Sequence, residues 1–111
     1  MTNKLVPKQI KLDLSKEEYQ PILNSEQETI FMKSGLVTLN PGESVGFHNT
    51  RNYEELIIVL QGQGKAVIKG KNSFDINPQI FVYIPPETEH DMVNTGTEKL
   101  KYIYVVSKTR N

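Results

Sequence analysis

The sequence predicts a single all-β domain, and three observations support this prediction. The chain has 111 residues, a length typical of one domain with one hydrophobic core. Valine and isoleucine supply 19 residues and alanine only one, and β-branched side chains favour strands over helices. Short apolar runs recur between Gly, Pro and Asn turns about every 8–12 residues, the spacing of sandwiches and barrels. We therefore expect about eight to ten short strands and no helix.

The N-terminal quarter of the chain, residues 1–28, is expected to lie outside the barrel core. Residues 4–14 alternate apolar and charged side chains with a period of two, which indicates an edge strand or an extended arm. Residues 15–18 have the form of a helix start, but Pro21 leaves room for no more than one turn. We predict that residues 15–24 are irregular, with one short strand at most.

The barrel core is expected in residues 29–106. Gly35 interrupts the extended run 29–39 and indicates a bulge or bend. Asn40-Pro41-Gly42-Glu43 is a turn by composition, and Gly70-Lys71-Asn72 is typical of a hairpin. Further strands are expected at 44–49, 55–60, 65–69, 73–76, 80–84, 90–94 and 100–106.

The arrangement of a turn, a histidine-bearing strand, a second turn and an apolar strand occurs twice. It surrounds His48 and then His90, the only two histidines in the chain. Two such halves are what a double Greek key, the jelly roll, requires. Both histidines therefore belong to the most strongly patterned segments, which suggests a site built from both halves.

Glu55 is the acidic residue that such a site would use. Alternate residues of a strand share a face, so Glu55 points into the barrel if Ile57 does, and Glu54 points away. A carboxylate inside an apolar interior is costly unless it is paired, hydrogen-bonded or bound to a cation. A register slip of one residue would exchange Glu54 and Glu55. A direct hydrogen bond between Glu55 and His48, without any metal, is the alternative to a metal site.

Charge and composition exclude several classes of function. The chain has 13 basic and 13 acidic residues and no block of like charge, so there is no electrostatic argument for nucleic acid or an anionic membrane surface. No apolar run is long enough to span a membrane, the N-terminus lacks the apolar core of a secretory signal, and the default location is the cytoplasm. The absence of cysteine limits any metal site to nitrogen and oxygen ligands. No motif indicates a catalytic nucleophile.

The spacing around His48 resembles the first motif of the cupin superfamily, Gly-x5-His-x-His-x3–4-Glu-x6-Gly. Here five residues separate Gly42 from His48, four separate Thr50 from Glu55, and six separate Glu55 from Gly62. The second cupin motif, Gly-x5-Pro-x-Gly-x2-His-x3-Asn, is matched in part.

That partial match runs from Pro85 through His90 to Asn94. With the strand pattern, the resemblance covers roughly residues 30 to 106 and implies a small jelly-roll (double-stranded β-helix) cupin barrel. It also implies that residues 1–111 form one small single-domain cupin of the conserved-barrel type. Similar small cupins are often homodimers, and the arm at 4–14 is the segment expected to pair with a second subunit.

The departures from the motifs matter as much as the matches. Thr50 stands where the family usually has its second histidine, and Gln79 and Glu87 replace two glycines of the second motif. Carried over residue by residue, the resemblance implies His48, Glu55 and His90 as metal ligands, with the Thr50 hydroxyl as a fourth contact or a partner for bound water. Two histidines and a carboxylate suit Fe(II), zinc, manganese or nickel.

A pocket above this site would be lined by side chains that share its face or its mouth. The alternative for aromatic side chains on strands is packing in the core or across strands. The pocket candidates are Phe47, Tyr83, Met92, Tyr102 and Tyr104.

The resemblance implies a metal-binding protein for a small molecule. A metal-dependent cupin would act on a small polar metabolite, such as a sugar derivative or an organic acid. The alternative is a non-catalytic cupin that binds or senses a small ligand, in which Thr50 marks a degenerate metal site. Sequence alone does not decide between an enzyme and a binding module.

Overall fold

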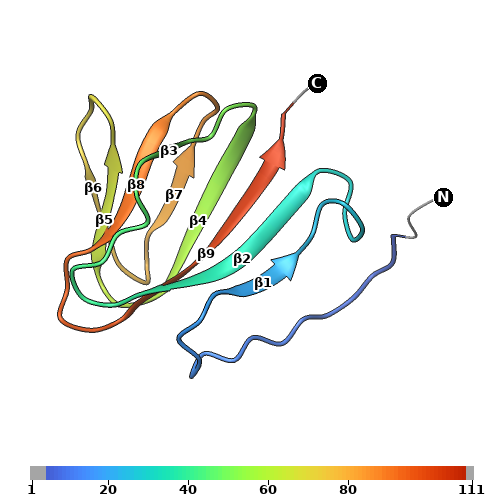
Figure 1. The fold of residues 1–111 in the computed structure, drawn as a ribbon, viewed down its shortest axis with the longest axis horizontal. Helices are drawn as coiled ribbons and strands as arrows, with labels where there is room; N and C mark the ends of the chain where they lie inside the picture. The colour runs from blue at the N-terminus through green and yellow to red at the C-terminus, as the bar shows by residue number, and fades with distance from the viewer. Residues whose placement is uncertain (1–4, 110–111) are drawn as a thin grey trace.

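The computed structural model describes residues 5–109 and contains nine β-strands and no helix in this part of the chain (Figure 1). Accordingly, no helix among these residues is long and apolar enough to cross a membrane. The prediction of an all-β fold is confirmed. The strands are β1 (Gln20–Leu23), β2 (Met32–Leu39), β3 (His48–Asn49), β4 (Tyr53–Gln61), β5 (Gly64–Ile68), β6 (Phe74–Ile76), β7 (Phe81–Ile84), β8 (Glu89–Asn94) and β9 (Leu100–Lys108).

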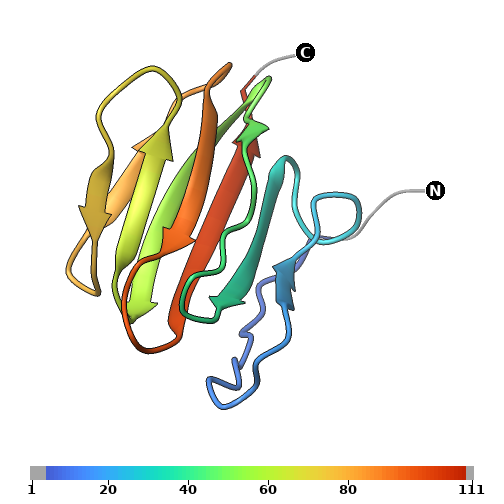
Figure 2. The same cartoon turned by 60° about the vertical axis from the view of Figure 1, so that its left-hand side comes forward.

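The strands form two antiparallel sheets that face each other (Figure 2). The five-stranded sheet has the order β1-β2-β9-β4-β7, and the four-stranded sheet has the order β3-β8-β5-β6. The chain passes from one sheet to the other at every step from β2 to β5 and again at every step from β6 to β9. This crossing in each half produces the predicted double-stranded β-helix, the jelly roll.

The hydrophobic core fills the space between the inner faces of the two sheets. On β4 the buried residues alternate with more exposed ones, and the same alternation on β5 and β7 supplies the core from both sheets. The core residues are Leu39, Ile57, Val59, Ala66, Ile68, Ile76, Val82, Ile84, Met92, Leu100 and Tyr102. The barrel is therefore a packed interior that leaves space at one end, where the candidate site lies.

The N-terminal segment is an extended arm and contains one short strand. Residues 5–19 form no strand, so of the two alternatives for 4–14 the structure has the arm; residue 4 lies outside the described residues. β1 falls within the segment predicted to be irregular with one short strand, and it pairs with β2. The buried Lys101 ammonium fixes the arm by donating to the Lys16 carbonyl oxygen at 2.7 Å and to Thr38 Oγ1 at 2.9 Å.

The prediction of a strand at 44–49 is wrong for most of that range. Ser44 makes only an isolated bridge to Val93, and β3 is limited to two residues. The interruption lies at Gly46, which has a φ of 100° that an extended strand cannot contain. The chain therefore approaches the site as a loop and becomes a strand only at His48.

Candidate metal centre

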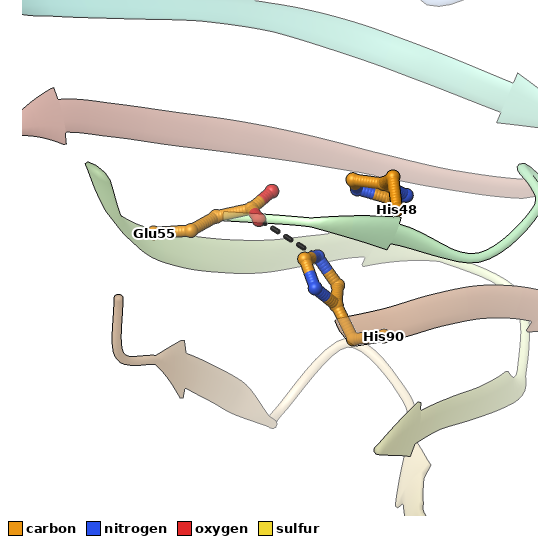
Figure 3. Close-up of side chains that lie close together, drawn as sticks. All are labelled: His48, Glu55 and His90. Atoms are coloured by element: carbon orange, nitrogen blue, oxygen red, sulfur yellow. Dashed lines mark hydrogen bonds and ion pairs between the residues drawn. The ribbon is translucent and has the colours of Figure 1, made fainter. Parts of the chain in front are cut away.

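Three side chains from three strands and both sheets meet at one end of the barrel interior. His48 on β3 and His90 on β8 are directly opposite partners in the four-stranded sheet, and Glu55 comes from β4 in the five-stranded sheet. Figure 3 shows the two imidazoles and the carboxylate pointing toward one another. One potential ligand atom from each of the three residues lies within 4.8 Å of the other two.

Glu55 points into the barrel, and the one-residue slip does not occur. Glu55 is 7% exposed and shares the inner face of the sheet with the buried Ile57. Glu54 lies on the outer face, where its carboxylate accepts a hydrogen bond from Tyr83 Oη at 2.8 Å. The alternation of side chains along β4 thus decides which of two adjacent glutamates belongs to the site.

His90 is completely buried and is held at both ring nitrogens. Its Nδ1 donates to the Thr88 carbonyl oxygen at 3.2 Å, because a carbonyl can only accept, and its Nε2 lies 2.9 Å from Glu55 Oε1. The His90–Glu55 pair therefore shares a proton between Nε2 and Oε1. Burial disfavours the charged imidazolium and by itself would lower the pKa of His90. The hydrogen bonds of His90 with Glu55 and with the Thr88 carbonyl, and the charges of Glu55 and Asp91, outweigh burial and raise this pKa above its ordinary value.

His48 is oriented by the loop that precedes it. Its Nδ1 donates to the Gly46 carbonyl oxygen at 2.9 Å, which leaves the lone pair of Nε2 available to the site. The ring centroids of His48 and His90 are 4.2 Å apart with the planes tilted by 56°. Glu55 forms its hydrogen bond with His90 and none with His48, so the alternative of a Glu55–His48 bond does not occur.

Thr50 has a structural contact that the sequence did not indicate. Its hydroxyl donates to the Pro85 carbonyl oxygen at 2.7 Å and accepts from the backbone N–H of Thr88 at 3.0 Å. Two backbone bonds, Thr50 N to Thr88 O at 3.1 Å and Glu87 N to Arg51 O at 2.9 Å, join the same two loops. We call this set of four hydrogen bonds the loop clasp.

A cavity of about 360 Å³ is lined by His48 and Glu55, whereas the completely buried His90 is not part of its lining. Three of the five pocket candidates line it, namely Met92, Tyr102 and Tyr104, together with Thr50. Burial raises the pKa of both tyrosine hydroxyls well above its ordinary value, with the charge of Glu55 adding to the effect, so both phenols stay protonated. The rest of the lining is Lys33, Val37, Val45, His48, Asn49, Tyr53, Glu55 and Val106.

The other two pocket candidates do not line this cavity. Phe47 is 54% exposed and Tyr83 is 57% exposed. Tyr83 follows the alternation of β7, in which Val82 and Ile84 face the core and Tyr83 faces outward. Phe47 belongs to the loop before β3 and does not turn toward the interior.

The donor set fits a divalent cation. An ion about 2.0–2.2 Å from nitrogen and oxygen ligands holds those ligand atoms roughly 3–3.5 Å apart. His90 Nε2 and Glu55 Oε1 are 2.9 Å apart, and all three ligand atoms lie within 4.8 Å of one another. His48 offers a free nitrogen, and His90 keeps its Nδ1 hydrogen bond while its Nε2 faces the site. In the metal-free arrangement a proton lies where an ion would bind, between His90 and Glu55.

Two residues near the site were missed by sequence reasoning. Lys33 lines the cavity, and Asp91 accepts a hydrogen bond from the Gly46 N–H at 2.8 Å. The position of Lys33 depends on the pairing of β2 with β9, and that of Asp91 depends on the loop before β3. The sequence contains one local indication for Lys33. It is two residues from Gly35, so the two residues share one face of the predicted strand.

Comparison with known proteins agrees with this architecture. Residues 35–106 match the profile of the Cupin domain family. The chain belongs to the cupin family. Its fold is similar to that of an RmlC-like cupin from Methanocaldococcus jannaschii, with a TM-score of 0.78, 15% identity and coverage of 94% of this chain and 93% of that one.

Two further proteins are similar to this cupin. A predicted oxalate decarboxylase from Thermotoga maritima has a TM-score of 0.75 and 24% identity, with 81% of this chain and 78% of that chain covered. A mannose-1-phosphate guanylyltransferase from Salmonella typhimurium is 33% identical over 73 residues, which are 66% of this chain and 15% of that protein. This cupin thus spans only a small part of that curated relative.

Proposed function

We propose that this cupin binds a divalent metal ion through His48, Glu55 and His90 and holds a small polar molecule in the cavity above it. The observation that carries the proposal is the convergence of two imidazoles and one buried carboxylate within 4.8 Å at the floor of a cavity. A bound ion would act as a Lewis acid that polarises an oxygen of the bound molecule. Zinc, iron, manganese and nickel all suit this donor set.

The residues of the chain supply the remaining parts of the site. Glu55 neutralises part of the charge of the cation, and the Thr88 carbonyl fixes the ring orientation of His90. Met92, Tyr102 and Val37 give the cavity an apolar wall, which excludes water from one side of the bound molecule. The proposed ligand classes remain a sugar derivative and an organic acid. The names of the Salmonella and Thermotoga proteins are consistent with one class each.

Non-catalytic binding or sensing is the second candidate, and the loop clasp favours it. The Thr50 hydroxyl already bonds to Pro85 and Thr88. The candidate metal ligands are therefore His48, Glu55 and His90, without a second histidine from the first motif. Three protein ligands with open positions also occur in catalytic sites. Conversion of candidate metabolites by the metal-loaded protein would distinguish an enzyme from a binding module.

Elemental analysis of protein purified without a histidine tag tests the metal proposal. We expect about one equivalent of metal in the wild type and its loss in His48→Ala, because two of three ligands hold an ion poorly. Asp75→Ala is the matched control, since Asp75 is exposed and pairs only with Lys65 in the β5–β6 hairpin. A wild type that takes up none of zinc, iron, manganese or nickel after loading would exclude the proposal.

We also propose that the chain forms a homodimer. Leu56 and Tyr83 are cross-strand partners on the outer face of the five-stranded sheet, and Phe81 lies on the same face; all three are exposed. The arm adds the exposed Leu5, Val6, Ile10 and Leu14. Light scattering should give twice the chain mass for the wild type and a lower value for Phe81→Asp; a monomeric wild type at working concentration would contradict this proposal.

A further inference from the structure

We propose that the cavity takes a small organic acid and that Lys33 binds its carboxylate. This inference rests on the proposed metal site, because the rest of the acid would bind at the ion. Lys33 lines the cavity, and within residues 5–109 its ammonium forms no hydrogen bond and no ion pair. It is the only lysine or arginine of the described residues that lines the cavity.

The register of the sheet places Lys33 at a fixed distance from the site. Val106 on β9 pairs with Lys33 on one side and with Glu55 on the other. All three side chains line the cavity, so they lie in one row on the same face. Neighbouring strands are about 4.8 Å apart, so the Cα atoms of Lys33 and Glu55 are about 10 Å apart. A molecule with a few carbon atoms spans the space between the ion and the lysine.

The charge of the cavity favours an anion. Among residues 5–109, Glu55 is the only acidic residue that lines the cavity, and it is paired with His90. A divalent ion held by one carboxylate leaves a net positive charge, and Lys33 adds to it. With the ion bound, the cavity therefore carries an excess of positive charge that attracts an anionic ligand.

Two phenols provide a further donor next to Lys33. The next inward-facing pair of the same two strands is Gly35 with Tyr104. Gly35 has no side chain, and the Tyr19 ring occupies that space, with Tyr19 Oη 2.6 Å from Tyr104 Oη. Tyr104 lines the cavity and Tyr19 does not, so the Tyr104 proton is available to a ligand when Tyr19 is the donor of this bond. A carboxylate at this end of the cavity meets an ammonium and a hydroxyl donor.

The remaining lining favours a carboxylic acid over a sugar phosphate. A phosphate dianion is usually held by several cationic or backbone donors, whereas this cavity has one lysine. Val37, Val45 and Met92 offer no hydrogen bonds to the hydroxyls of a sugar. These side chains do fit a short carbon chain with a polar group at each end.

Calorimetric binding of malonate, succinate and glutarate to the zinc-loaded protein tests this assignment. We expect at least one of these dicarboxylates to bind the wild type and to bind Lys33→Met about 10- to 100-fold more weakly, since a charged hydrogen-bonding partner is removed. Lys33→Arg should keep most of the affinity. Lys71→Met, which removes a charge from the β5–β6 turn outside the cavity lining, should bind as the wild type does.

Zinc stoichiometry is measured on every variant, which separates the two proposals. Suppose that the wild type and Lys33→Met both bind zinc. Equal dicarboxylate affinity in the two proteins, or no binding of any dicarboxylate, would then overturn the role of Lys33 and leave the metal site intact. Lys33-dependent binding of mannose 1-phosphate but of none of the three acids would overturn the carboxylate assignment. A wild type that binds no zinc or other divalent ion would overturn both proposals.

Discussion

At the scale of single residues, His48 depends on a carboxylate that does not face the cavity. Asp91 accepts a hydrogen bond from the Gly46 N–H at 2.8 Å, and the Gly46 carbonyl accepts one from His48 Nδ1 at 2.9 Å. Asp91 is 7% exposed, so the hydrogen bond that holds the loop before β3 is shielded from solvent. Asp91 is thus a positioning residue for the nitrogen that His48 offers to the site.

We expect Asp91→Ala to weaken metal binding by about 10- to 100-fold, the usual effect of removing such an outer partner. Asp91→Asn should stay within a few-fold of the wild type, because its amide oxygen can still accept from Gly46. Competition with a chromophoric chelator measures the affinities, and circular dichroism checks folding. Equal metal affinity in Asp91→Ala and the wild type would show that His48 needs no such support.

Metal binding should depend on pH through the proton shared by His90 and Glu55. The pKa of His90 is raised, so the proton stays in place to a higher pH than on a free imidazole. An ion must displace it, so the dissociation constant should increase about tenfold for each pH unit below the raised pKa and level off above it. Zinc titrations between about pH 5.5 and pH 8.5 would show this profile.

Glu55→Gln provides the internal comparison for this pH profile. The amide removes the negative charge that favours the His90 imidazolium, so the midpoint of the profile should move to lower pH even though overall affinity falls. A dissociation constant that does not change with pH in the wild type would mean that no proton is released at His90.

At the scale of elements, the loop clasp joins two of the connections that carry the chain between the sheets. One connection joins β3 to β4, the other joins β7 to β8, and the Thr50 hydroxyl accounts for two of the four bonds between them. Both loops also contain a non-glycine residue with positive φ: Arg51 at 56° and Glu87 at 55°. Such conformations are tolerated when surrounding bonds impose them.

We expect Thr50→Val to lower the free energy of unfolding by about 1–3 kcal/mol, because it leaves buried partners at Pro85 and Thr88 unsatisfied. Thr50→Ser, which keeps the hydroxyl, should be close to the wild type. Urea denaturation of the metal-free proteins gives these values. Metal affinity should change little in Thr50→Val; a loss of affinity much larger than the loss of stability would make Thr50 a contact of the ion.

The sequence predicted those elements whose pattern is local. The apolar run that ends at Leu60 identified β4 to within two residues of its ends, and the motif spacing to Gly62 favoured Glu55 over Glu54. The strand prediction failed at 44–49, because the φ of Gly46 is stabilised by Asp91, a residue 45 positions away. Motif spacing named the three residues that meet at the site, whereas Lys33 could not be named because its place depends on which strand lies beside β2.

The departures from the second cupin motif show the same limit. Glu87 stands where the second motif has a glycine, and it has the positive φ that glycine adopts easily. What the sequence did not show is the bond from Glu87 N to the Arg51 carbonyl that holds this conformation. Turn type can be predicted from residue type, but the partner across the barrel cannot.

At the scale of the whole molecule, the candidate site connects the two sheets. His48 and His90 belong to the four-stranded sheet and Glu55 belongs to the five-stranded sheet. In the metal-free arrangement the connection between the sheets at this point is the single bond from His90 to Glu55. An ion bound by all three residues would replace it with a link that exists only in the folded state, because unfolding separates strands far apart in the sequence.

Zinc should therefore stabilise the whole fold. At a free concentration of about 100 times the dissociation constant, the expected gain in free energy of unfolding is about 2.7 kcal/mol, which should raise the melting temperature by several degrees. Calorimetric scans with zinc and with a chelator measure the difference. His48→Ala should lose the gain, and Asp75→Ala, altered at the opposite edge of the four-stranded sheet, should keep it. A gain of the same size in His48→Ala would place the stabilising ion somewhere other than between the two sheets.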